Sequence, residues 1–282
     1  MELHFMPAPN LSPLEIAAPE GHADLSVYLL PASESLPHRA DKPMVIVCPG
    51  GAYSFCSDRE AEPIAAKYLA AGFHAAVLRY HCAPARYPVA MCELAWSVAL
   101  CRRMAAKWHI NTDAIFVVGF SAGGHLAASL GTLWDDPVLH ACLSPDYSWR
   151  PNGQILCYPV ITMREFAHIG SRDNLLGAHA QPNMLERLSL EKQVNDKTVP
   201  AFLWHTYEDG AVPVENSLLY ASALSKHKIP FELHVFEKGQ HGLSTCEDIT
   251  SDLGNEIVPD NQSWIDMSIR FIRRRAKNLM EE

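Results

Sequence analysis

A serine between two glycines stands where an apolar run of β-strand character passes into a helix-forming segment, and no other feature restricts the fold as much. The segment is Val117–His125, with Ser121 at its centre. A strand-to-helix turn this tight needs glycine on both sides of the serine, because neighbouring backbone approaches closely there. The turn would lift the Ser121 hydroxyl clear of a sheet and place it at a helix N-terminus, where free amides and the helix dipole favour negative charge. We interpret the segment as a nucleophile elbow.

Apolar runs separated by helical patterns make up most of the remaining chain. Continuous apolar runs are typical of strands buried on both faces of a parallel sheet. They cover residues 44–48, 74–78, 115–118, 154–161 and 200–206, and helices are predicted over 60–71, 89–108, 213–226 and 263–279. Alternating runs predict an edge strand at 25–29 and a half-exposed strand at 231–236. This order predicts an α/β fold, a doubly wound and mostly parallel sheet with helices on both faces.

Residues 162–196 have no strand pattern and contain only short helical pieces. We interpret this segment as a small cap or rim insert, which would shape access to a site. The chain has 282 residues and 48% hydrophobic content. Both values suit one domain over residues 1–282.

Composition excludes several classes of partner. The formal net charge of -9 leaves no basic surface for a nucleic-acid backbone, and the basic run Arg273–Arg275 is read as the solvated face of a terminal helix. No apolar run is long enough to span a bilayer, and the N-terminal residues do not have a signal-peptide pattern, so we expect a cytoplasmic protein without a membrane partner. The 8 scattered cysteines are expected to be reduced, and neither they nor the 14 histidines form a metal-binding motif. We therefore expect no metal and no cofactor, and a homo-oligomer remains open.

A hydroxyl nucleophile needs a histidine base, and that base needs a carboxylate to orient it. Asp209 and His241 each follow a predicted strand, and the order Ser121, Asp209, His241 is that of the α/β-hydrolase fold. Glu208 is an alternative acid that sequence alone does not exclude. His125 is the alternative base, although it has no matching acid.

The glycines of Pro49–Tyr53 follow a buried strand, where backbone amides can line a crevice. With the elbow downstream, we interpret this segment as an oxyanion loop. Tyr53, His125 and Tyr158 are candidate substrate contacts. Glu60 and Glu62 are assigned to stabilising the first turn of the following helix and not to catalysis.

Five motifs together resemble the acetyl-esterase and xylan-esterase-like branch of the α/β hydrolases over about residues 44–243. They are Pro49–Tyr53, Gly119–Leu126, Tyr158–Thr162, the stretch from His205 through Asp209 and Val212–Pro213 to Glu215–Ser217, and Gly239–Leu243 with His241 at its centre. The resemblance implies Ser121 as nucleophile, His241 as base and Asp209 as acid. It also implies oxyanion amides from the Gly51–Ala52 loop and from Ala122.

The sequence departs from that pattern at two positions of the oxyanion loop. Pro49 stands where related esterases often have histidine, and Ala52 stands where a third glycine is common. Backbone N–H donors survive both changes. Because alanine tolerates positive φ poorly, the geometry of the loop is open, and so is the choice between Gly51 and Ala52 as donor.

The leading hypothesis is therefore a serine carboxylesterase without a cofactor that acts on a small acyl ester. The resemblance implies short acyl groups, often acetyl groups on sugars such as xylo-oligosaccharides. An amide hydrolase, either a formamidase or a peptidase, would use the same residues. A non-catalytic binding protein on the same fold is the third hypothesis.

Overall fold

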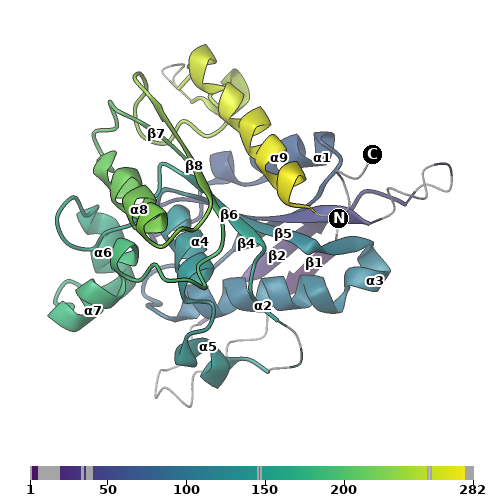
Figure 1. The fold of residues 1–282 in the computed structure, drawn as a ribbon, viewed down its shortest axis with the longest axis horizontal. Helices are drawn as coiled ribbons and strands as arrows, with labels where there is room; N and C mark the ends of the chain where they lie inside the picture. The colour runs from purple at the N-terminus through teal and green to yellow at the C-terminus, as the bar shows by residue number, and fades with distance from the viewer. Residues whose placement is uncertain are drawn as a thin grey trace.

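Eight strands form one sheet in the order β1-β2-β4-β3-β5-β6-β7-β8 (Figure 1). The fold is taken from a computed structural model, which describes residues 2–5, 20–32, 35, 41–144, 146, 148–252, 254 and 256–276. The strands are β1 (Glu2–Phe5), β2 (Asp24–Tyr28), β3 (Lys42–Cys48), β4 (His74–Arg79), β5 (Ile110–Phe120), β6 (Gly153–Cys157), β7 (Ala201–Thr206) and β8 (Phe231–Phe236). The pairs from β4 through β8 are parallel, whereas β1 and β2 are added antiparallel at one side.

The prediction of an edge strand at 25–29 was wrong. β2 pairs with β4 on one side and with β1 on the other, and the side chains of Leu25 and Val27 are fully buried. The alternation of the segment gave its strand character but not its place, because a local pattern does not show which strands pair and residues 2–5 add a further strand outside it.

Helices cover both faces of the sheet, as the continuous apolar runs predicted. The longer ones are α1 (Glu62–Ala70), α2 (Val89–Arg103), α4 (Ser121–Leu133), α8 (Glu215–Lys226) and α9 (Ser263–Arg275), and the shorter ones are α3 (Ala105–Trp108), α5 (Pro137–Cys142), α6 (Ile169–Leu176) and α7 (Pro182–Arg187). In Figure 1, α1 and α9 lie on one side of the sheet, and α2, α4 and α8 lie on the other.

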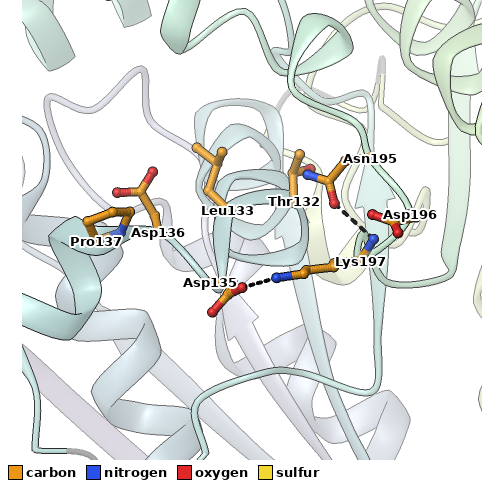
Figure 2. Close-up of a pocket in the computed structure, with 8 residues that line it drawn as sticks. All are labelled: Thr132, Leu133, Asp135, Asp136, Pro137, Asn195, Asp196 and Lys197. Carbon is orange, nitrogen blue, oxygen red and sulfur yellow. Dashed lines mark hydrogen bonds and ion pairs between the residues drawn. The ribbon is translucent and has the colours of Figure 1, made fainter.

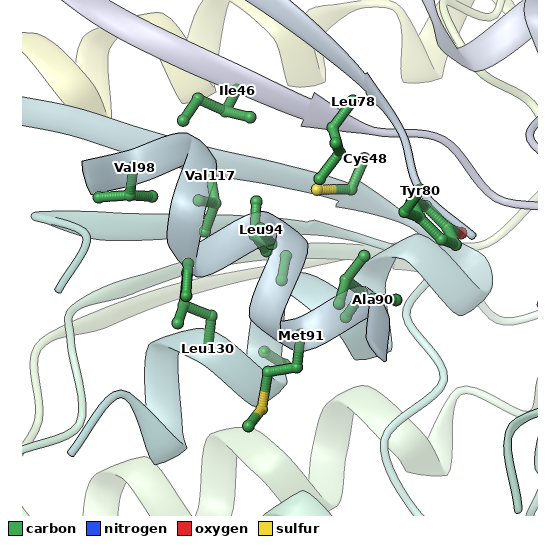
Figure 3. Packing of buried hydrophobic residues seen from close by; sticks show 14 of the residues in the cluster. Ile46, Cys48, Leu78, Tyr80, Ala90, Met91, Leu94, Val98, Val117 and Leu130 are labelled. Atoms are coloured by element: carbon green, nitrogen blue, oxygen red, sulfur yellow. The ribbon is translucent and has the colours of Figure 1, made fainter. Parts of the chain in front are cut away.

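Alternate residues of the central strands pack into two separate hydrophobic cores, one on each face of the sheet. Met44, Ile46 and Cys48 of β3 pack with α2 and α4, and Figure 3 shows Ile46 and Val117 facing Leu94 of α2 and Leu130 of α4. Val45 and Val47 point to the other face and pack with α1 and α9. β3 is therefore buried on both faces, which explains its unbroken apolar sequence.

Several element boundaries differ from the predictions. The helix expected from residue 60 begins at Glu62, after a separate 3-10 turn over Asp58–Glu60, because Ala61 (φ -108, ψ -106) leaves the helical conformation. The strand expected to reach residue 161 ends at Cys157, since Tyr158 has φ 36 and Pro159 lacks an N–H group. The helix expected over 89–108 breaks at Met104, and residues 277–279 of the terminal helix lie outside the described residues.

The insert over 162–196 contains α6, α7 and a 3-10 turn (Leu190–Lys192) and no strand, as expected. In Figure 1, α6 and α7 lie together beside α8. Asn216 at the start of α8 fixes the entry to the insert, because its side-chain oxygen accepts hydrogen bonds from the amides of Ile161 (2.9 Å) and Thr162 (3.1 Å).

The junction of β5 and α4 has no room for side chains at its glycines. A Cβ atom on Gly119 would lie 2.1 Å from the carbonyl oxygen of Gly123, and one on Gly123 would lie 2.2 Å from the carbonyl oxygen of Cys48 at the end of β3. The start of α4 therefore rests directly on the carboxyl ends of two neighbouring strands.

We predict that Gly119→Ala destabilises the protein by about 3 kcal/mol and lowers Tm by about 5 to 10 °C, because the helix must move away from the strand. Gly210→Ala is the matched control, since a Cβ atom there would meet no other atom within 4 Å. Thermal unfolding followed by circular dichroism measures both variants. Equal Tm values for the two would contradict the close packing described.

Candidate functional site

The Ser121 hydroxyl stands at the first residue of α4 and faces a histidine. Ser121 adopts φ 53, a left-handed conformation that a serine takes only in a constrained turn, and it is buried apart from 7% of its surface. Its Oγ lies 2.8 Å from Nε2 of His241, which follows β8. This distance permits direct transfer of the hydroxyl proton to the imidazole.

The other nitrogen of His241 faces a buried carboxylate. Nδ1 of His241 lies 2.6 Å from Oδ2 of Asp209, which follows β7. The other oxygen of Asp209 accepts hydrogen bonds from the amides of Ala211 (3.0 Å) and Val212 (2.8 Å). Burial opposes the charge of Asp209, but hydrogen bonds from His205 and His241 outweigh it and hold the pKa of this carboxyl well below its usual range. An ionised Asp209 fixes the proton of His241 on Nδ1 and leaves Nε2 free to act as a base.

His205 is a second partner of this carboxylate. Its side chain is completely buried, with Nε2 3.3 Å from Oδ2 of Asp209 and 2.9 Å from the carbonyl oxygen of Val212. Because a carbonyl only accepts, Nε2 carries the proton, and Nδ1 accepts the hydroxyl of Ser217 (2.8 Å). His205 lies in one of the five motifs, but its role is not predictable from the sequence, because nothing in its strand pattern shows that it faces Asp209.

Neither Glu208 nor His125, the alternative acid and base, is placed to replace Asp209 or His241. The Glu208 carboxylate is exposed and bonds the Lys238 ammonium at 2.7 Å and the Gly239 amide at 3.2 Å. His125 is buried, and both of its nitrogens have partners: Nε2 donates to the carbonyl oxygen of Leu188 (2.9 Å), and Nδ1 accepts the hydroxyl of Tyr53 (3.0 Å). The structure therefore brings Ser121, His241 and Asp209 together and leaves these two alternatives outside.

The loop after β3 faces the same edge of the sheet. The Gly50 amide donates to Oε2 of Glu60 at 2.8 Å, so it is occupied within the protein. The amides of Gly51 and Ala52 have no acceptor among the described residues. Ala52 adopts φ 55, so this alanine does take the left-handed conformation that a glycine would adopt more easily. The Ala122 amide lies in the first turn of α4, where N–H groups have no intrahelical partner.

The assignment of Glu60 to helix stability was wrong. Its side chain is buried and lies before α1, where it accepts the Gly50 amide and the hydroxyl of Tyr158 (2.6 Å). A glutamate before a helix carries no sequence signal of such burial, since the partners come from distant segments. Glu62, in contrast, starts α1 and pairs with Arg79 (2.8 Å) on a partly exposed surface.

The structure does not support the expected substrate contacts. Tyr53, His125 and Tyr158 are each at least 97% buried, and their polar side-chain atoms bond within the protein. Tyr158 instead packs against His241, with ring centroids 5.1 Å apart at 71°. The sequence predicted correctly that Tyr53 and Tyr158 lie near strand ends, but it did not show in which direction their side chains point.

The insert supplies two residues to the neighbourhood of the site. Asn174 of α6 donates to the carbonyl oxygen of Ala52 at 2.9 Å. His168 caps α6 by accepting the Ser171 amide at 3.2 Å. Burial lowers the pKa of His168, and the nearby His241 lowers it further, which favours the neutral form of its imidazole.

A pocket of about 310 Å³ lies at the far end of α4, away from Ser121 (Figure 2). It is lined by Thr132, Leu133, Asp135, Asp136, Pro137, Asn195, Asp196 and Lys197. Asp135 pairs with Lys197, and Asp136 pairs with Arg187. Since α4 rises about 1.5 Å per residue, this pocket is separate from the hydroxyl of Ser121.

Within the described ranges, no cluster of three histidine, cysteine or acidic side chains is arranged to hold a metal ion. None of the helices in those ranges combines the length and apolar character that crossing a bilayer requires.

A family model described as BD-FAE matches residues 29–224, which is more than half of the chain. The chain belongs to the BD-FAE family. It is 40% identical over 214 residues to endo-1,4-beta-xylanase B of Butyrivibrio fibrisolvens, covering 72% of this chain and 33% of that protein. It is 29% identical over 232 residues to an acetylxylan esterase of Xylanibacter ruminicola, covering 78% and 46%. The chain thus spans a third to just under half the length of these relatives.

Solved structures agree with membership of the BD-FAE family. The fold matches an acetyl ester-xyloside bifunctional hydrolase from Caldicellulosiruptor lactoaceticus with a TM-score of 0.80 and 37% identity, covering 91% of this chain and 89% of that one. It matches a carboxylesterase from Lactobacillus plantarum with a TM-score of 0.83 and 26% identity, covering 100% and 98%. The predicted α/β-hydrolase fold and the resemblance to acetylxylan esterases are confirmed. These findings support a carboxylic ester hydrolase.

The choice between the two neighbouring acids can be tested by amide substitution. We predict that Asp209→Asn lowers kcat for an activated ester by about 10³- to 10⁴-fold, because the asparagine no longer fixes the proton of His241 on Nδ1. Glu208→Gln is the matched control and should stay within about twofold of wild type, since it removes only an exposed ion pair. Steady-state kinetics measure both. A larger loss in the Glu208 variant would contradict the geometry.

A second prediction follows from the buried His125. Burial lowers its pKa to about 4, whereas the unfolded chain takes up the proton near pH 6.5. The contribution of neutral His125 to the free energy of unfolding is fully present above pH 6.5. About 3 kcal/mol of it is lost as pH falls toward 4. His125→Gln keeps a donor for Leu188 and an acceptor for Tyr53 but does not titrate, so denaturant unfolding should show a smaller loss over this range. Exposed His179→Gln is the control, and equal slopes for the two variants would contradict the prediction.

Proposed function

We propose that the protein is a serine carboxylesterase that hydrolyses short acyl esters, with acetyl esters as preferred substrates. The observation that carries the proposal is the continuous set of hydrogen bonds from Oγ of Ser121 through His241 to the ionised Asp209, at 2.8 Å and 2.6 Å. These contacts join loops that follow three different strands, β5, β7 and β8.

The geometry supports a two-step acyl transfer. Oγ of Ser121 attacks the ester carbonyl carbon while Nε2 of His241 takes the hydroxyl proton. The tetrahedral intermediate then collapses, and the departing alkoxide takes that proton from His241. Water attacks the acyl-enzyme with His241 again as base, which releases the acid and restores Ser121. Asp209 stays ionised and stabilises the imidazolium in both steps.

The oxyanion would be held by backbone amides at the N-terminus of α4 and in the loop after β3. Ala122 is one donor, and the loop supplies Gly51 or Ala52, since the Gly50 amide is occupied by Glu60. Donors of this kind act at the charge that develops in the transition state, where each is worth about 10²- to 10³-fold in kcat.

Acetylated sugars are the substrate class that we favour. The proteins that this chain is similar to include an acetylxylan esterase and an acetyl ester-xyloside bifunctional hydrolase. Exposed aromatic side chains also flank the site in sequence: Phe55 follows the oxyanion loop, Phe166 lies in the insert, and Tyr207 precedes Asp209. Aromatic rings with an open face suit the apolar face of a sugar ring.

The test is hydrolysis of p-nitrophenyl acetate, butyrate and octanoate beside an acetylated xylo-oligosaccharide. We predict fastest turnover of acetate, release of acetic acid from the sugar, and a loss of at least about 10³-fold in Ser121→Ala. Ser222→Ala, on the exposed side of α8, is the matched control and should keep full activity.

Other outcomes separate the alternatives. Turnover of activated esters without acetate release from the sugar would remove the sugar class and keep the esterase. Faster turnover of N-formyl or peptide amides than of esters would favour an amide hydrolase. Ligand binding without turnover, unchanged in Ser121→Ala, would favour a binding protein.

A further inference from the structure

Two loops that must act together in catalysis are far apart in the sheet. The oxyanion loop (Pro49–Tyr53) follows β3, and the histidine loop (Gly239–Ser244) follows β8. β5, β6 and β7 lie between these two strands, so no direct strand pairing sets their separation. Some other set of contacts must fix the distance between the oxyanion amides and His241.

The turn formed by Arg59 and Glu60 contacts both loops. Oε2 of Glu60 accepts the Gly50 amide at 2.8 Å, and Oε1 accepts the hydroxyl of Tyr158 at 2.6 Å. The same hydroxyl accepts the amide of Ser244 at 2.9 Å. Burial and the adjacent Glu60 raise the pKa of Tyr158 well above its usual value, so the hydroxyl keeps its proton and donates it to Glu60.

Arg59 holds the histidine loop by separate contacts. Its guanidinium donates to the carbonyl oxygen of Gly242, and its own carbonyl oxygen accepts the Ser244 hydroxyl at 2.6 Å. The guanidinium also pairs with Glu256 at 2.9 Å, which limits its movement. Together with the Tyr158 link, these bonds attach the turn to the histidine loop at Gly242 and Ser244, just after His241.

The contacts with Glu60 are tight and have no solvent to replace them. Glu60 is 4% exposed and Tyr158 is 1% exposed, and a Cβ atom on Gly50 would lie 2.6 Å from Oε2 of Glu60. A buried carboxylate without its donors is strongly unfavourable, so the two bonds to Glu60 form together or the segment rearranges.

We propose that the Arg59–Glu60 turn sets the distance between the oxyanion amides and His241, which makes Glu60 a positioning residue for catalysis. This inference rests on the proposed function. Glu60 touches neither the ester nor Ser121 in this role and acts through the Gly50 amide and the Tyr158 hydroxyl. Its loss should therefore weaken binding of the transition state more than binding of the ester.

The experiment compares Glu60→Ala, Glu60→Gln and Tyr158→Phe with wild type on p-nitrophenyl acetate. Active sites are counted with a fluorophosphonate, so that kcat refers to correctly folded enzyme only. Glu60→Ala should lower kcat per active site by about 10- to 100-fold with KM changed by less than about threefold. Affinity for methylboronic acid, which forms a tetrahedral adduct with the serine, should fall by the same factor as kcat.

The other variants separate the two links. Glu60→Gln keeps one oxygen for the Gly50 amide and should recover much of the loss. Tyr158→Phe keeps the ring against His241 but loses the hydroxyl that joins Glu60 to Ser244. This variant should therefore lower kcat even though Glu60 is unchanged. Glu62→Gln is the matched control, because its carboxylate pairs with Arg79 away from the site, and it should behave as wild type.

A purely structural role would lower Tm and the number of active sites and leave kcat per active site and boronate affinity at the wild-type values, which would overturn the proposal. Wild-type kinetics in Tyr158→Phe would overturn it as well if Glu60→Ala does not fold. If the wild-type protein hydrolyses no ester, the proposed function fails instead. The rate of fluorophosphonate labelling of Ser121 then tests the turn, and equal rates in wild type and Glu60→Ala would overturn it.

Discussion

The site depends on the close approach of α4 to the end of β3. Carbonyl oxygens of Cys48 and Pro49 lie 2.2 Å and 2.3 Å from where a Gly123 Cβ would be, so the helix can sit there only without that side chain. The contact brings the first turn of α4, with Ser121 and the Ala122 amide, against the loop that carries Gly51 and Ala52. With a wider spacing, the Ser121 hydroxyl and the backbone amides could not act on the same carbonyl group.

Burial determines the chemistry of the groups that converge there. The carboxylate of Asp209 is removed from water, yet two imidazoles and two backbone amides stabilise its charge, so it stays ionised where burial alone would protonate it. His125 has no charged partner among the described residues, and burial keeps it neutral. Two buried groups of the same fold thus differ in charge, because their hydrogen-bond partners differ.

Local pattern was sufficient to predict the sheet, the elbow and the positions of Ser121, Asp209 and His241 after three strands. Continuous apolar runs precede Ser121 and Asp209, and an alternating run precedes His241. Local pattern failed where a role depends on distant contacts. Glu60 has the sequence of a helix start, and its two donors come from the loops after β3 and β6. Tyr53 and Tyr158 were expected to face a substrate, but the direction of a side chain after a strand end depends on packing that the pattern does not contain.

The insert contacts the catalytic elements at two points. Asn174 of α6 holds the carbonyl oxygen of Ala52, and the carbonyl oxygen of Leu188 orients the imidazole of His125 on α4. The insert is thus part of the framework behind the reacting groups. Exchange of the insert between relatives should therefore change the reaction rate even for an ester too small to touch it.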